Sequence, residues 1–189
     1  MGNEIKVRII RSNRKTLSIE LKPDGLIARA PNRMKEKDIY KFIESKKNWI
    51  EKHLVKLNER QKVLDELKPY TQEEIREFTA KAKIEIPKRV EFYAKKIGVS
   101  YNRITIRCQH TRWGSCSSKG NLNFNCLLVL LPDEVIDSIV VHELCHIKQM
   151  NHSARFYAEI DKVFPNYKQC HLWLKQNGSF YLNRIAKLK

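Results

Sequence analysis

The sequence predicts an α+β protein organised in two units, and three observations indicate this. Residues 5–31 alternate between apolar and polar side chains around turn-forming residues, which is typical of short strands. Most of the remaining chain has apolar residues every three or four positions, which is typical of amphipathic helices. A charged passage over 58–67 runs to Pro69, and we interpret it as the join between the two units. We therefore expect a small N-terminal unit over 1–68, with a three-stranded antiparallel sheet and a helix, and a larger unit over 69–189.

The composition limits the class of protein. Of 189 residues, 42% are apolar, which is enough to bury a core, and 31% are charged. No apolar run approaches the roughly 20 residues needed to cross a bilayer, and the N-terminus has no apolar signal core, so we expect no membrane partner. Five cysteines without a CxxC pair argue against a disulfide framework. These features favour a cytoplasmic location.

The net charge of +16 is spread along the chain. Residues 1–60 carry 16 basic and 8 acidic groups, and residues 61–189 carry 21 and 13, so each part has a charge of +8. A basic surface attracts nucleic acid, anionic membranes or acidic partners. Solvated lysine-rich helix faces explain the charge equally well, since no base-reading motif accompanies it.

The N-terminal unit begins with three alternating stretches, 5–10, 17–21 and 26–30, and Pro23–Gly25 marks a turn between the last two. Two hairpins alone are marginally stable, so the sheet needs a partner. We expect that partner to be an amphipathic helix over about 34–64.

The second unit opens with a capping box, in which Thr71 is the N-cap and Glu74 stands three residues later. The helix should run to about Ile97 and end at Gly98, with a kink or restart at Pro87.

Two further stretches, 103–108 and 122–127, alternate as strands on either side of a turn-rich passage. We expect them to form a hairpin with a wide connection. The segment 122–126 would then be an edge strand that leads toward the next helix.

Three helices are expected after this hairpin. The first opens at Pro132 with two acidic residues and has apolar residues on all sides, so it should be buried. Ser153 can cap the second, which closes at Pro165. The third should cover Tyr167–Gln176, with Asn177–Gly178 as its stop.

The first of these helices contains His-Glu-x-x-His at residues 142–146. Residues four apart lie on one helix face, so His142 and His146 can bind one ion, while Glu143 can contact a water held by that ion. This is the pattern of a zinc hydrolase. The alternative is two core histidines with Glu143 in an ion pair, which would be costly without a metal.

His152 is the candidate third ligand, but only if the helix ends before it. A continuing helix would place His152 about 240° around from His146. We therefore expect the helix to end near 149–151, with Asn151 in the left-handed conformation. The alternative third ligand is Glu159 on the following helix.

Three protein ligands leave a fourth position for water, which is typical of a catalytic zinc. Glu143 would take a proton from that water and deliver it to the leaving amine of a peptide or protein substrate. Candidates for a second electrophile are the polar residues Tyr157, Tyr167, His171 and Arg112. Strand 122–126 could pair with an extended peptide. The remaining substrate-binding residues stay unknown at this stage.

The chain resembles the YgjP-like metallopeptidases, bacterial metal-dependent hydrolases related to the SprT-like and WLM zincins. The motifs that carry the resemblance are 142–146, 151–156, 112–117 and 122–125. The resemblance implies a zincin-like catalytic domain with Zn²⁺. It also implies metal ligation by His142, His146 and His152 and catalysis by Glu143, whereas family substrates are largely unassigned.

We therefore predict a zinc metallopeptidase. Two other functions stay open: a zinc hydrolase of a non-peptide amide or ester, and a basic nucleic-acid-associated protein with a structural or vestigial zinc site.

Overall fold

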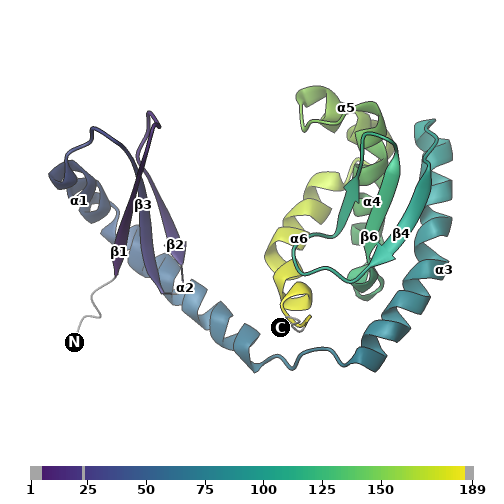
Figure 1. The fold of residues 1–189 in the computed structure, drawn as a ribbon, viewed down its shortest axis with the longest axis horizontal. Coiled ribbons are helices and arrows are strands. Elements are labelled where there is room, and N and C mark those ends of the chain that lie inside the picture. Colours follow the sequence, from purple (N-terminus) through teal and green to yellow (C-terminus); the bar gives the residue numbers. More distant parts are fainter. Residues whose placement is uncertain (1–5, 23, 186–189) are drawn as a thin grey trace. The chain divides into compact units, whose positions relative to one another are not determined.

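The structure is a computed structural model that describes residues 6–22 and 24–185. It divides into two compact units, Met1–Leu67 and Lys68–Lys189. Each unit has its own three-stranded sheet, and the buried residues form two separate cores (Figure 1). The structure is α+β, as the sequence predicts.

The sheet of the first unit has the order β1-β3-β2, from strands β1 (Val7–Ser12), β2 (Ser18–Lys22) and β3 (Gly25–Pro31). β2 and β3 pair antiparallel, but β1 and β3 pair parallel, so the prediction of an all-antiparallel sheet is wrong for β1. β3 takes the centre because its Leu26, Ala28 and Ala30 are almost completely buried.

Two helices cover this sheet in place of the single helix predicted over 34–64. They are α1 (Glu36–Ser45) and α2 (Lys47–Glu66), and the break lies at Lys46, whose φ and ψ are −109° and 9°. α2 continues through most of the charged passage that the sequence suggested as the join. Its lysine, glutamate and glutamine side chains are good helix formers, which explains why the passage stays helical.

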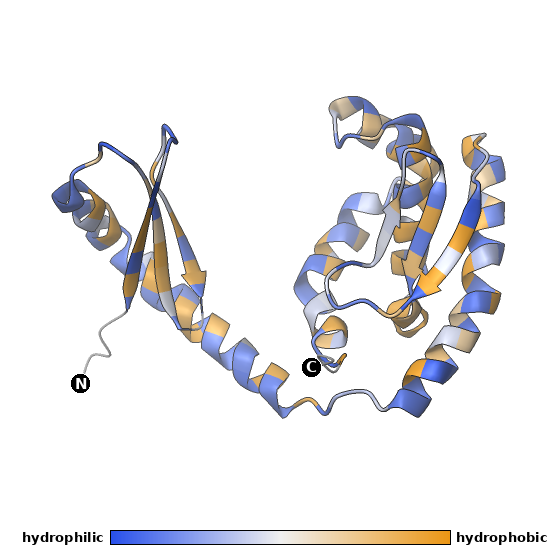
Figure 2. Cartoon of the chain, in the orientation of Figure 1, coloured by the Kyte–Doolittle hydropathy of each residue, from blue (hydrophilic) through white to orange (hydrophobic). Residues whose placement is uncertain are grey.

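The second unit starts with α3 (Gln72–Ile97), and its capping box is confirmed. The Glu74 backbone N–H donates to the Thr71 hydroxyl at 3.1 Å, and the Thr71 N–H donates to the Glu74 carboxylate at 2.7 Å. The helix ends at Gly98, whose φ of 73° is left-handed. α3 is assigned as one helix through Pro87, so a restart at that residue is wrong. Apolar and polar residues alternate along α3 (Figure 2).

The second sheet has the order β4-β6-β5, from strands β4 (Arg103–Arg107), β5 (Gly114–Cys116) and β6 (Asn121–Asn125). β4 and β6 are parallel, so the hairpin predicted over 103–127 is wrong, and β6 is the central strand and not an edge. The Asn125 side-chain amide donates to the carbonyls of Gln109 and Arg112 at 2.7 and 2.9 Å. These bonds hold the segment between β4 and β6 beside β6. Within that segment, β5 pairs antiparallel with the side of β6 that β4 leaves open.

A short 3₁₀ helix, η1 (Cys126–Leu130), leads from β6 to three α-helices. These are α4 (Asp133–Lys148), α5 (Ala154–Val163) and α6 (Tyr167–Leu182). α4 contacts α3, β5, α5 and α6, so it lies at the centre of the second unit (Figure 1). No helix within the described part of the chain is both long enough and apolar enough to span a bilayer.

α6 continues through Asn177–Gly178, which the sequence suggested as its stop. Gly178 is buried, and a Cβ atom there would lie 3.1 Å from the Trp113 indole nitrogen. This glycine therefore permits close packing between α6 and Trp113 instead of ending the helix.

Candidate active site

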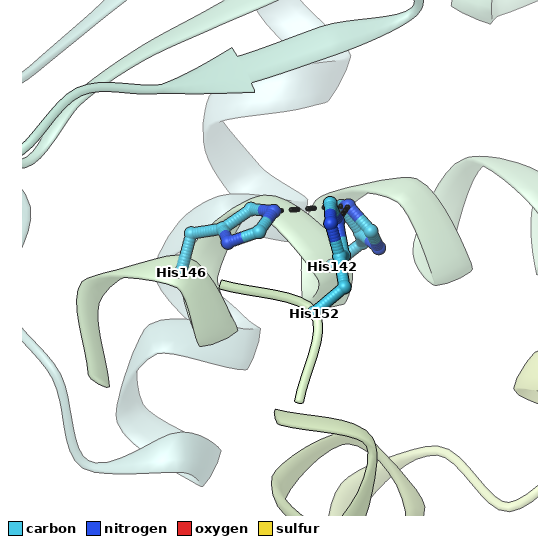
Figure 3. A group of neighbouring side chains, drawn as sticks. All are labelled: His142, His146 and His152. Carbon is cyan, nitrogen blue, oxygen red and sulfur yellow. Dashed lines mark hydrogen bonds between the residues drawn. The ribbon is translucent and has the colours of Figure 1, made fainter. Parts of the chain in front are cut away.

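Three histidines converge at the C-terminal end of α4 (Figure 3). The Nε2 atom of His142 lies 3.1 Å from that of His146 and 3.2 Å from that of His152. Nitrogens bound tetrahedrally at the usual zinc distance of about 2.0–2.1 Å lie roughly 3.3 Å apart. Lone pairs of neutral imidazoles repel one another at such distances, and a shared cation removes that repulsion. The geometry therefore fits a metal ion.

The chain returns to this cluster because α4 ends before His152, as the sequence predicts. The last helical residue is Lys148, and Gln149 is extended, with φ and ψ of −140° and 101°. Ser153 then caps α5 by accepting a hydrogen bond from the Phe156 N–H at 3.4 Å. The prediction of a left-handed conformation at Asn151 is wrong, since no described residue other than glycine has a positive φ. An extended Gln149 reverses the chain without it.

Two further groups hold the imidazoles in place. The Nδ1 atom of His142 lies 2.7 Å from the Tyr167 hydroxyl, and that of His146 lies 3.1 Å from the Gln149 carbonyl oxygen. When Nδ1 donates in these bonds, Nε2 keeps its lone pair for a metal. The sequence suggested Tyr167 as an electrophile but did not indicate its contact with His142. No local pattern indicates a contact between residues 25 positions apart.

An apolar wall packs against these histidines, and burial favours the uncharged form of His142 and His146. The ring of Phe156, which is fully buried, lies 4.5–5.0 Å from the rings of all three histidines. Burial, with the neighbouring histidines, lowers the pKa of His142 to about 3. Burial also lowers the pKa of His146. Neutral imidazoles are the form that binds metals.

Glu143 lies beside the cluster and is only 6% exposed. Burial raises the pKa of its carboxyl group to about 8, while Arg112 acts in the opposite direction. Gly114 on β5 lies against this side chain, and a Cβ atom there would be 2.7 Å from the Glu143 Oε1 atom. Only glycine leaves room for the carboxylate, a requirement that sequence reasoning missed.

A cavity of about 160 Å³ opens beside Glu143 and His142. Its other lining residues come from α4, α6, β5 and the position before β5, and they are mostly apolar or aromatic; they are Trp113, Gly114, Ser138, Ile139, Tyr167, His171 and Leu174. β6 is paired on both sides and cannot accept a peptide, whereas β5 has a free edge and contacts α4. The strand suited to an extended substrate is therefore β5 and not 122–126.

The other candidates lie outside the histidine cluster. Glu159 forms ion pairs with Lys148 at 3.2 Å and Lys162 at 2.5 Å, and the group of possible metal ligands consists of the three histidines. The Tyr157 ring is 6.4 Å from that of His152 and 44% exposed. His171 stacks on Tyr167, with 5.7 Å between the ring centres.

One protein family and several solved structures are similar to this chain. The chain matches the family described as "YgjP-like, metallopeptidase domain" over residues 15–77 and 62–177. Among solved structures, it is similar to the metallopeptidase zymogens of Pyrococcus abyssi abylysin and Methanocaldococcus jannaschii jannalysin. The first is 24% identical, with 48% of this chain and 93% of that chain covered and a TM-score of 0.44. The second is also 24% identical, with 49% and 96% covered and a TM-score of 0.45.

No curated protein matches the chain. The family match, in contrast, covers most of the chain and includes the histidine cluster and Glu143. The chain therefore belongs to the YgjP-like family and is a metallopeptidase.

Proposed function

We propose that this metallopeptidase binds zinc through His142, His146 and His152 and cleaves peptide bonds with Glu143 as the general base. The observation that carries the proposal is the convergence of three histidines beside a buried carboxyl group, with the His142 Nε2 atom 3.1 and 3.2 Å from the Nε2 atoms of His146 and His152. Three nitrogen ligands with an open fourth position are the pattern of catalytic zinc, and they suit zinc better than calcium or magnesium, which prefer oxygen.

When bound, zinc supplies Lewis acidity, which polarises a substrate carbonyl and lowers the pKa of a water molecule. Glu143 accepts the proton of the attacking water and delivers it to the amine that leaves. Burial raises the pKa of the Glu143 carboxyl group in the metal-free protein, and a bound zinc cation would lower that pKa again toward the range in which a general acid–base works best. Tyr167 and the Gln149 carbonyl keep the imidazoles oriented during turnover.

The substrate in this proposal is an extended peptide. Its backbone pairs with the free edge of β5, and one of its side chains enters the cavity of about 160 Å³ beside Glu143. A structure with a bound peptide inhibitor tests this placement. Main-chain hydrogen bonds to Gly114–Cys116 are expected, and an inhibitor bound without them would contradict it.

The proposal as a whole is tested by metal content and peptidase activity, measured together on purified protein. Wild type should contain about one zinc per chain and cleave an unstructured protein substrate. His152→Ala should lose both zinc and activity, whereas Glu143→Gln should keep zinc and lose activity. Unchanged activity in Glu143→Gln would refute the mechanism, and unchanged zinc in His152→Ala would refute the ligand set.

A cytoplasmic location stays a prediction from the sequence. The five cysteines are all free thiols in the structure, which is consistent with a reducing compartment.

A further inference from the structure

Helix α2 in the first unit carries a stripe of exposed basic and aromatic side chains. Trp49, His53 and Lys56 follow one another at intervals of four and three residues, so they lie on one side of the helix; Lys46, immediately before the helix, lines a cavity together with Trp49 and completes the stripe. Trp49, His53 and Lys56 occupy an arc of about 60° around the helix axis. The four acidic residues of α2 all lie outside this arc; they are Glu51, Glu59, Asp65 and Glu66. The charges of the stripe are therefore the positive charges of Lys46 and Lys56.

A recess lies at the N-terminal end of the stripe. This cavity of about 220 Å³ is lined by Ile19, Phe42, Lys46 and Trp49. The Lys46 ammonium group lies 5.9 Å from the centre of the Phe42 ring, within the range of a cation–π interaction. The recess thus combines an apolar floor with a cation at its rim.

Trp49 forms a flat and well-held wall of this recess. Its side chain is 45% exposed. The His53 ring stacks on it with 4.4 Å between ring centres, and the His53 Nδ1–H donates to the Trp49 carbonyl at 2.8 Å. The indole is therefore held in one orientation with one side facing solvent.

We propose that this face of α2 binds single-stranded nucleic acid. A base stacks on Trp49 in the recess, and neighbouring phosphates contact Lys46, Lys52 and Lys56, which are exposed. Each nucleotide carries both a flat ring and a negative charge, which matches an aromatic platform beside lysines. An acidic peptide matches the lysines but offers no flat ring with each charge. In a duplex the bases are stacked on one another, so the platform suits an unpaired strand.

The test is binding of a fluorescently labelled oligothymidylate to the full-length protein, followed by anisotropy at several salt concentrations. Trp49→Ala and Lys56→Glu should each weaken binding about tenfold, because stacking is worth about 1–3 kcal/mol per base and a reversed charge repels phosphate. Trp49→Phe should retain most of the affinity. Lys62→Glu is the matched control, since Lys62 is exposed on the same helix outside the stripe, and it should change the affinity less than about twofold.

Intrinsic fluorescence gives a second readout. The oligonucleotide should quench emission in the wild type but not in Trp49→Ala, whose other two tryptophans lie in the second unit. Circular dichroism checks that each variant is folded.

Four outcomes would overturn the proposal. These are no binding, equal weakening by Lys62→Glu and Lys56→Glu, equal affinity for an abasic oligonucleotide, and equal affinity for polyglutamate. The last two would show that charge alone is recognised, and polyglutamate binding would assign the stripe to acidic proteins.

Discussion

Glu143 shows how one small neighbour positions a reactive side chain. The carboxyl group is buried, and the absent side chain of Gly114 leaves the space that it occupies. The packing of β5 against α4 thus determines where the proposed general base can point.

At the scale of this residue, Gly114→Ala should reduce kcat by about a hundredfold while zinc content stays the same. The added methyl group would displace the Glu143 carboxylate, and a displacement of about 1 Å can cost that much. Activity assays and metal analysis of the same preparation check this. Ser115→Ala on the same strand is the control, and an equal loss in that variant would attribute the effect to β5 in general.

The stability of the metal-free protein should fall as the pH rises from 7 to 8. Glu143 has a pKa near 8 when folded and 4.5 when unfolded, so in this range only the folded state holds the proton. Stability then decreases as pH rises, by about 1 kcal/mol over this interval. His142 makes stability increase with pH, because its pKa falls from 6.5 to about 3 on folding. That contribution applies below pH 6.5 and therefore outside this interval.

Urea unfolding of the metal-free protein at pH 7 and pH 8 measures this change. Glu143→Gln should have nearly the same stability at both values. A wild-type protein that is equally stable at both would contradict the raised pKa of Glu143.

At the scale of elements, α4 supplies two histidines while its neighbours orient them. Tyr167 begins α6, and its hydroxyl reaches His142 on α4. The packing of α6 on α4 is therefore part of the proposed metal site.

Tyr167→Phe should weaken zinc binding by about 10- to 100-fold, because the His142 Nδ1 atom loses its hydrogen-bond partner. Competition with a chromophoric chelator measures the affinity. Tyr157→Phe removes a hydroxyl from a half-exposed ring near the site and should leave the affinity unchanged. Equal affinities for wild type and Tyr167→Phe would remove Tyr167 from this role.

An ion-pair network joins α3 to the N-terminal half of α4. Arg89 donates to Asp137 at 2.6 Å and also pairs with Asp133, while the Tyr93 hydroxyl donates to Asp137 at 3.1 Å. Asp137 and Arg89 are only 22% and 23% exposed, so the pair is partly shielded from solvent.

Arg89→Met should therefore lower the free energy of unfolding by about 1–3 kcal/mol, since it leaves a shielded Asp137 with only the Tyr93 hydroxyl. Denaturant unfolding checks the value. Lys88→Met, on an exposed neighbouring position of α3, should change stability by less than about 0.5 kcal/mol. A similar loss in both variants would mean that the network contributes little.

At the scale of the whole molecule, the proposed metal ligands and the proposed nucleic-acid stripe belong to different units. The two cores share no residue. Ligand binding stabilises only the folded structure that contains the site.

Removal of zinc should consequently increase hydrogen exchange in α4 and α5, and leave exchange in β1–β3 and α2 unchanged. When the free zinc concentration is 1,000 times the Kd, bound zinc stabilises the folded second unit by about 4 kcal/mol, and this stabilisation is lost when zinc is removed. Mass spectrometry of protein with and without a chelator measures both regions together. Increased exchange in the first unit would show that the two units unfold together.

Much of the candidate site follows from local sequence. The His-Glu-x-x-His spacing places His142 and His146 on one helix face, and the need to end that helix before His152 indicates the reversal that the structure contains. The capping box at Thr71 and the cap at Ser153 are equally local. Such features depend on residues within one or two helical turns, so the sequence alone determines them.

Contacts between distant segments are what only the tertiary structure decided. The parallel pairing of β1 with β3 and of β4 with β6, the contact of Tyr167 with His142, and the space at Gly114 for Glu143 depend on which surfaces bury one another. A short alternating strand can pair in either direction with similar local energetics, and burial of the whole core selects one. The sequence thus determined the chemical groups of this metallopeptidase and their helix, and packing decided how they are oriented.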